Sequence, residues 1–239
     1  MENNIYGYNP EKDERMSSSL TFPALMSKVY LWMTLALITT GLTAYYVATN
    51  ESILYAIVNN PGITIGLFVA ELALVMYLSV RVMKMSFAAA SIIFILYSII
   101  NGATLSLILM AYTMESIATT FFITAGTFGA MSVFGMFTKK NLSTMGSFLI
   151  MALFGLIIAT VVNMFVASTA FGWILTYAGV LIFCGLTAYD TQQMKQTLMN
   201  MEYAGETNML KIALMCSLSL YLDFINLFLY LLRIFGDRE

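Results

Sequence analysis

The sequence predicts an all-α integral membrane protein with seven transmembrane helices, on two observations. The first is composition, because 60% of the 239 residues are hydrophobic and only 10% are charged, whereas soluble domains average about 25% charged residues. The second is that the apolar residues form long uninterrupted runs, each long enough to cross about 30 Å of hydrocarbon as a helix. None of these runs contains a proline, which disfavours transporter folds with broken helices.

The chain begins with a polar segment, residues 1–20, which includes the charged run Glu11–Arg15. Such a segment buries too little apolar surface to order itself, so we expect a cytosolic N-terminal tail. The apolar stretch that follows is too long, and its flank too acidic, for a cleaved signal peptide. We therefore expect residues 21–239 to form a single seven-helix transmembrane domain. Its predicted spans are Ala24–Ala48, Gly62–Val80, Phe87–Tyr112, Ile117–Phe137, Gly146–Val166, Trp173–Asp190 and Ile212–Leu232.

Lysine and arginine residues in the connections predict the orientation of the chain, because short cytosolic loops are enriched in both. Basic residues precede the first span and recur between spans two and three, four and five, and six and seven, whereas the other connections have none. The pattern predicts a cytoplasmic N-terminus. Seven crossings then place the C-terminus outside, where Arg233 and Arg238 run against the rule, so a re-entrant last segment is an alternative.

Several chemistries are excluded by composition. The sequence contains no histidine, which rules out Ser–His proteases, histidine-ligated zinc sites and HExxH metalloproteases. No basic cluster exceeds the pair Lys139 and Lys140, so we expect no nucleic-acid partner. Cys184 and Cys216 lie in apolar runs without metal-ligand spacing and are interpreted as reduced packing residues. We expect a protein that is not an enzyme and carries no cofactor.

Three acidic residues lie at membrane depth, namely Glu71 in the second span, Asp190 at the end of the sixth and Asp223 inside the seventh. An acid within the bilayer costs about 2.5–3.5 kcal/mol on insertion scales, so each is a functional candidate. The two aspartates flank one helical hairpin with a polar connection. If the sixth helix runs to about residue 200 and the seventh begins near 209, they lie about 15 and 21 Å from these helix ends. We expect them to meet in the cytosolic half of the membrane.

Two carboxyl groups in contact at low dielectric tend to share one proton and titrate as a coupled pair. A shared proton would hold the sixth and seventh helices together, and its loss would add a repulsive charge. Cytosolic pH would then bias an open or a closed state. A cation at the inner end of the second span, Arg81 or Lys84, is a candidate latch that locks onto the deprotonated pair. Both cations also fit simple anchoring on the cytosolic side.

Two motifs, each built around one aspartate, carry a family resemblance. The segments GLTAYDTQQMK (Gly185–Lys195) and SLYLDFINLFLYLLRIFG (Ser219–Gly236) resemble the Bax inhibitor-1 family. The segments LSVRVMKMS (Leu78–Ser86) and YSIINGATLS (Tyr97–Ser106) are weaker matches that extend the resemblance over nearly the whole chain after about residue 25.

The resemblance implies a pH-sensitive calcium leak in which six helices surround the seventh and Asp190 and Asp223 form a di-aspartyl sensor. It also implies an arginine partner near the inner end of span two, matched by Arg81 with Lys84 as the alternative. Glu71 matches a recurrent acidic position and either faces the ion path or serves as a protonated packing residue. Calcium prefers several hard oxygen ligands, and clustered acids are few here, so we expect only transient calcium contact at the two aspartates.

Other functions fit parts of this pattern. Intramembrane aspartyl proteases also place two aspartates on adjacent helices, the first in a Tyr-Asp pair like Tyr189 and Asp190. Their second aspartate lies in a GxGD motif, however, whereas Asp223 follows the bulky Tyr221 and Leu222. A membrane regulator that acts through protein partners and transports nothing is the main alternative. We expect the lipid bilayer, calcium ions and protons as partners, a monomer or weak oligomer, and a bacterial inner membrane, or the ER membrane in a eukaryote.

Overall fold

The computed structural model describes residues 21–200 and 205–238, and every regular element in this part of the chain is helical. Seven of these helices are long and apolar enough to cross a membrane, which confirms the predicted fold class. The predicted polar tail, residues 1–20, lies outside the described residues. In chain order the elements are α2 (Phe22–Thr49), α3 (Glu51–Asn59), α4 (Pro61–Arg81), the 3₁₀ turn η1 (Val82–Lys84), α5 (Phe87–Leu109), α6 (Met114–Phe137), α7 (Ser143–Val166), α8 (Thr169–Met199) and α9 (Glu206–Phe235).

The predicted spans and the observed helices differ at several boundaries. The short helix α3 was not predicted, although Asn50 caps it by accepting a hydrogen bond from the Ile53 amide at 3.2 Å. Helix α5 ends at Leu109, before the predicted boundary. Helix α8 continues beyond Asp190 to Met199, although the apolar run itself ends at Asp190. The polar stretch after Asp190 stays helical because it lacks glycine and proline and buries one face against the bundle.

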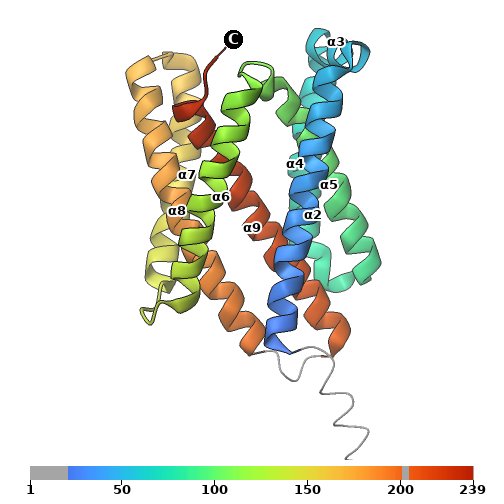
Figure 1. Ribbon diagram of the computed structural model, residues 1–239, viewed down its shortest axis with the longest axis vertical. Helices are drawn as coiled ribbons and strands as arrows, with labels where there is room; N and C mark the ends of the chain where they lie inside the picture. The colour runs from blue at the N-terminus through green and yellow to red at the C-terminus, as the bar shows by residue number, and fades with distance from the viewer. Residues whose placement is uncertain (1–20, 201–204, 239) are drawn as a thin grey trace, which may run out of the picture.

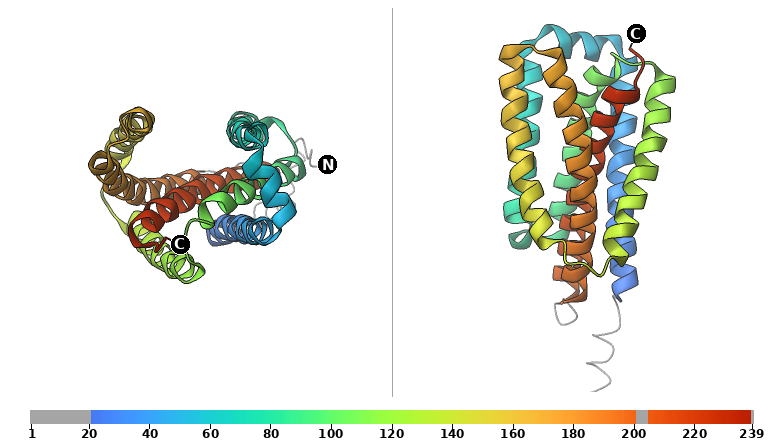
Figure 2. Two further views of the ribbon diagram at one scale, coloured as in Figure 1. Left: turned by 90° about the horizontal axis from the view of Figure 1, so that it is seen from above. Right: turned by 90° about the vertical axis from the view of Figure 1, so that its left-hand side faces the viewer.

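Helix α9 lies at the centre of the bundle. It is the most buried of the seven spans, and it packs against α2, α5, α6 and α8. The left view of Figure 2 shows α9 beside α8 in the middle, with α4 and α7 at the two far ends. Helix α4 packs mainly on α5, and α7 packs mainly on α8. Figure 1 shows that α9 crosses the bundle obliquely.

Two glycines bring neighbouring helices close to the turn of α8 that precedes Asp190. Gly135 of α6 lies against the backbone of Ala188, so that an added Cβ would collide with the Ala188 carbonyl group. Gly146 of α7 lies against the ring of Tyr189 in the same way. Small residues permit such close approach between membrane helices. The turn that carries Asp190 is therefore held between α6 and α7.

Side-chain hydrogen bonds fix the same part of α8 to the connection between α6 and α7. Gln192 accepts from the Leu142 amide at 2.8 Å and donates from Nε2 to the Lys140 carbonyl oxygen at 2.9 Å. Lys195 donates from Nζ to the Met136 carbonyl oxygen at 2.8 Å, near the C-terminus of α6. These bonds satisfy backbone groups that the ends of α6 and α7 leave free.

Candidate functional site

The two aspartates line one cavity of about 420 Å³ formed by α7, α8 and α9. Asp223 of α9 is only 5% exposed, and Asp190 of α8 is half-buried. No hydrogen bond joins the two carboxyl groups in the part of the chain that the structure describes.

The tilt of α9 explains how residues at different distances along their helices reach the same cavity. Asp190 lies about 14 Å along the axis from the end of α8 at Met199, and Asp223 lies about 26 Å from the start of α9 at Glu206. The second distance is longer than expected because α9 begins earlier than residue 209. The oblique path of α9 in Figure 1 shortens its depth in the membrane, so both residues line the same cavity.

Asp223 has an unsatisfied oxygen in this cavity. Its Oδ2 atom is buried and has no hydrogen-bond partner among the residues that the structure describes. The other polar side chains that line the cavity are neutral, namely Ser219, Asn226 and Tyr230. A buried carboxylate oxygen without a partner is energetically costly. It is therefore a group that gains from taking up a proton or from contact with a cation.

A second cavity, of about 380 Å³, connects Asp190 to the end of the molecule where α8 ends and α9 begins. Its lining includes Gln193 and Thr197 of α8, Met215 of α9, and Met83 of η1. Asp190 and Ser219 line both cavities. The two cavities therefore adjoin at this pair of residues, and together they run from the α8–α9 connection to the buried oxygen of Asp223.

An aromatic pair lies at the far end of the aspartate cavity. Tyr230 stacks on Phe183 with ring centroids 5.8 Å apart, and its ring lies so close to Gly179 that an added Cβ would overlap it. One turn further along α9, Arg233 lines a separate polar cavity of about 540 Å³ that also contains Arg238. The stacked rings thus lie between the aspartates and the arginine-lined end of the bundle.

The two candidate latch residues are not joined to the aspartates. Arg81 ends α4 and Lys84 ends η1, and both side chains are exposed. Within residues 21–200 and 205–238, no ion pair links either cation to Asp190 or Asp223. Met83, which lies between the two cations, does line the cavity next to Asp190. Their segment therefore reaches this cavity, although their charged groups do not face it.

A buried lysine near this cavity escaped the sequence reasoning. Lys211 of α9 is 9% exposed and donates from Nζ to the Met83 carbonyl oxygen at 3.3 Å, so it ties η1 to α9. Its spacing of four and eight residues from Met215 and Ser219 places all three on one helical face, and that pattern could have identified it.

Glu71 lies on the opposite side of α9 from the aspartate cavity. It is half-buried near Thr104, and its Oε1 atom has no hydrogen-bond partner in the described part of the chain. Glu71 belongs to α4, which packs mainly on α5, whereas only α7, α8 and α9 line the aspartate cavity. The structure therefore separates Glu71 from the cavity that Asp190 and Asp223 share.

A polar network surrounds Tyr221 on this opposite side. The Tyr221 hydroxyl donates to Asn101 Oδ1 at 3.0 Å and shares a hydrogen bond of 2.7 Å with the Thr40 hydroxyl. The Thr40 hydroxyl has a single hydrogen, and the Ser98 carbonyl oxygen at 3.0 Å is an alternative acceptor for it. The network joins α2, α5 and α9. Sequence reasoning missed it, because uncharged polar residues scattered in apolar runs give little signal until the helices are placed.

The described residues contain no group of three or more acidic or cysteine side chains that could hold a metal ion. A calcium ion at the aspartates would therefore have at most two carboxylates, together with neutral oxygens such as those of Ser219 and Asn226. Tight calcium sites use six to eight oxygen ligands. The donor set here is suited to brief contact with a cation.

Comparison with known proteins gives consistent matches over nearly the full length of the chain. The family model described as "Inhibitor of apoptosis-promoting Bax1" matches residues 23–239. The chain is 44% identical to the inner membrane protein YbhL of Escherichia coli over 230 residues, which cover 96% of this chain and 98% of YbhL. It is 43% identical to an uncharacterized protein of Borreliella burgdorferi, with 90% of this chain and 92% of that protein covered. A protein of Deinococcus radiodurans is 40% identical, with 90% of each chain covered.

Proposed function

Because the chain belongs to the Bax inhibitor-1 family of integral membrane proteins, we propose that it is a pH-sensitive calcium leak gated by Asp190 and Asp223. One observation carries the proposal: both carboxyl groups line a single cavity at membrane depth, where one buried oxygen of Asp223 lacks a partner. Ionisable groups within a membrane span commonly belong to ion or proton pathways.

The gate follows from the charge of the pair. With one shared proton, the pair carries a single negative charge and α8 and α9 stay together. Loss of that proton places two negative charges in a cavity whose other polar side chains are neutral, and the repulsion favours separation of the helices. The same two charges attract a divalent cation. One chemical event thus opens the path and provides weak contact for calcium.

The described conformation fits the closed state of such a leak. The stacked rings of Tyr230 and Phe183 lie across the route from the aspartate cavity towards Arg233. Arg81 and Lys84 are exposed near the entrance, where a small shift of η1 would bring one of them to the deprotonated pair. Binding of that cation to the deprotonated aspartates would hold the gate closed. This is a second way in which pH can act on the gate.

We place the protein in the inner membrane of a bacterium, with its N-terminus in the cytoplasm. The alternation of basic residues between successive connections supports this orientation. The name of the similar Escherichia coli protein supports the membrane. The aspartate cavity would then open towards the cytoplasm, and cytosolic pH would set the state of the gate.

The test is calcium flux into liposomes that contain only the purified protein, measured with a trapped indicator over a series of pH values. We expect wild-type flux to rise with pH, because repulsion grows as the shared proton is lost. Asp190→Asn and Asp223→Asn should each lose this pH dependence. Glu115→Gln is the matched control, because this exposed acid at the start of α6 lies far from the cavity.

The outcomes separate the proposal from its alternatives. Unchanged pH dependence in both aspartate variants would refute the gate. Absence of flux from the purified wild-type protein would favour a regulator that acts through other proteins. Flux that falls with rising pH would identify cation capture as the dominant effect, and Arg81→Gln or Lys84→Gln should then reverse its direction.

A further inference from the structure

A large cavity in the bundle lies away from the aspartates. It is a groove of about 780 Å³ between α2 and α6, with α9 as its floor. Helices α2 and α6 both pack on α9 but make little direct contact with each other. Figure 1 shows the two helices side by side with α9 crossing behind them. Since both walls are membrane spans, the groove opens sideways towards the hydrocarbon of the bilayer.

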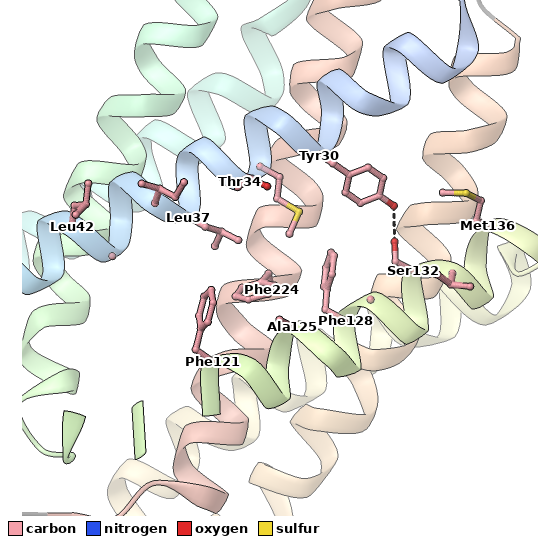
Figure 3. A pocket seen from close by; sticks show the side chains of 15 residues that line it. Tyr30, Thr34, Leu37, Leu42, Phe121, Ala125, Phe128, Ser132, Met136 and Phe224 are labelled. Atoms are coloured by element: carbon pink, nitrogen blue, oxygen red, sulfur yellow. Dashed lines mark hydrogen bonds between the residues drawn. The ribbon is translucent and has the colours of Figure 1, made fainter. Parts of the chain in front are cut away.

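The walls of the groove are apolar and partly aromatic. Figure 3 shows Phe121 and Phe128 of α6 and Phe224 of α9 together between α6 and α2, and Leu37 and Leu42 line the groove from α2. Phe128 and Phe224 are nearly completely buried and pack against each other, with ring centroids 5.5 Å apart. Such a surface offers dispersion contacts along its length but few hydrogen bonds. It suits a flexible apolar chain.

Two glycines, Gly41 of α2 and Gly129 of α6, widen the groove from its opposite walls. A Cβ added at either position would meet nothing within 4 Å. Close helix packing therefore does not explain these glycines, in contrast to Gly135 and Gly146. Their missing side chains instead leave space in the groove.

The polar groups of the groove gather at one end. There the Tyr30 hydroxyl hydrogen-bonds with Ser132 at 2.6 Å (Figure 3), and Ser132 hydrogen-bonds with Thr191 of α8 at 3.0 Å. Met136 also lines this end, and its carbonyl oxygen accepts a hydrogen bond from the Lys195 ammonium group. Lys195 does not line the groove itself, but its ammonium group lies one hydrogen bond beyond Met136 at this end. Two hydroxyls at the end of an apolar groove, with a cation just beyond them, match the order of groups in a phospholipid.

We propose that this groove binds one acyl chain of an anionic bilayer phospholipid, with the phosphate beside Lys195 and the chain between α2 and α6. The groove extends about 18 Å along α2, from Tyr30 to Leu42, and about 22 Å along α6, from Phe121 to Met136. The acyl chains of one leaflet cover about half of the 30 Å hydrocarbon core. The groove is therefore long enough to hold a chain from the leaflet at its polar end.

The shape of the groove argues against a protein helix as its occupant. A helix with its side chains is about 10 Å across, whereas α2 and α6 are joined by a direct hydrogen bond at the polar end. The groove therefore narrows to a point that a helix cannot enter. A single acyl chain can follow such a taper because it is thin and flexible.

The test is native mass spectrometry of the purified full-length chain, mixed with phosphatidylglycerol or phosphatidylcholine of identical acyl chains, or with the free fatty acid. We expect the wild-type protein to retain one phosphatidylglycerol molecule, with about tenfold weaker retention of phosphatidylcholine and little of the free acid. Gly129→Leu and Gly41→Leu should each reduce phosphatidylglycerol retention about tenfold, because the new side chain occupies the groove. Gly155→Leu on α7 is the matched control, since a Cβ there also meets open space.

A second comparison tests the position of the phosphate. Lys195→Gln should lower the retention of phosphatidylglycerol to that of phosphatidylcholine, whereas Lys28→Gln should not, because Lys28 lies two residues before Tyr30 and so on the other side of α2. Equal retention by the Gly129→Leu, Gly41→Leu and Gly155→Leu variants would overturn the proposal, as would preferential retention of the free acid. Equal retention of the two phospholipids by the wild type would overturn the assignment of the phosphate. Thermal unfolding of each variant checks that it is folded.

Discussion

Tyr221 and Asp223 lie on two different faces of α9, and these buried polar side chains differ in whether they have hydrogen-bond partners. On the face towards α2 and α5, the hydroxyl of Tyr221 is bonded to both Thr40 and Asn101. On the face towards α7 and α8, only two residues further along, the Oδ2 atom of Asp223 has no partner within the described chain. Both side chains are almost completely buried. Of these two neighbouring buried side chains, Tyr221 is therefore satisfied by other helices and Asp223 is not.

This difference separates stability from function. A bonded polar network between membrane helices contributes to stability and fixes how the helices pack. An unpaired buried acceptor lowers stability, and its presence is understandable where a proton or an ion comes and goes. Substitutions on the two faces should therefore have different consequences, although the residues are neighbours in the sequence.

The largest change in the free energy of unfolding is expected from Tyr221→Ala. Removal of this buried ring should lower the free energy of unfolding by about 3–5 kcal/mol, because it leaves a cavity and unpairs Thr40 and Asn101. Tyr221→Phe keeps the ring and should cost about 1 kcal/mol. Thermal unfolding in detergent measures both changes. Tyr46→Ala is the control, since Tyr46 is 60% exposed, and an equal loss there would show that the network is not responsible.

Asp223→Asn is expected to change the free energy of unfolding by less than Tyr221→Ala does, and in the opposite direction. The carboxamide has the same shape but no charge, so the free energy of unfolding should stay equal to that of the wild type or rise by about 1 kcal/mol at high pH. The difference should disappear in acid, where the wild-type carboxyl group is also uncharged. Unfolding curves recorded across the pH range measure this. A loss as large as that of Tyr221→Phe would mean that Asp223 is a packing residue.

The smallest change in the free energy of unfolding is expected from Glu71→Gln. Because Glu71 is half-buried and lies on the Tyr221 side of α9, the substitution should change the free energy of unfolding by less than about 0.5 kcal/mol. The pH dependence of calcium flux should remain. If flux instead lost its response to pH, Glu71 would belong to the ion path, and the distinction between the two faces of α9 would fail.

The sequence predicted the spans well because a bilayer imposes a length on apolar runs, and that length is visible without a structure. It predicted Asp190 and Asp223 as candidates for the same reason, since charge is costly in lipid. It did not predict the roles of Lys211 or Tyr221. A lysine near a helix end looks like an anchor until its partner on η1 is placed, and a tyrosine in an apolar run gives no sign of the two helices that it bonds.

The hydroxyl chain from Tyr30 through Ser132 to Thr191 affects how easily α2 can separate from α6. Other hydroxyls in these two helices bond to a carbonyl oxygen four residues earlier, as Thr43 does to Thr39 and Thr124 to Thr120. If α2 moved away, Ser132 could rotate and bond in the same manner to its own helix. The buried Thr191 hydroxyl, which would lose its partner, could bond back to its own helix in the same manner. The hydrogen bonds between α2 and α6 can therefore break and form again at little energetic cost. Because Thr191 directly follows Asp190, such a change alters the hydrogen bonding of the residue next to the aspartate cavity.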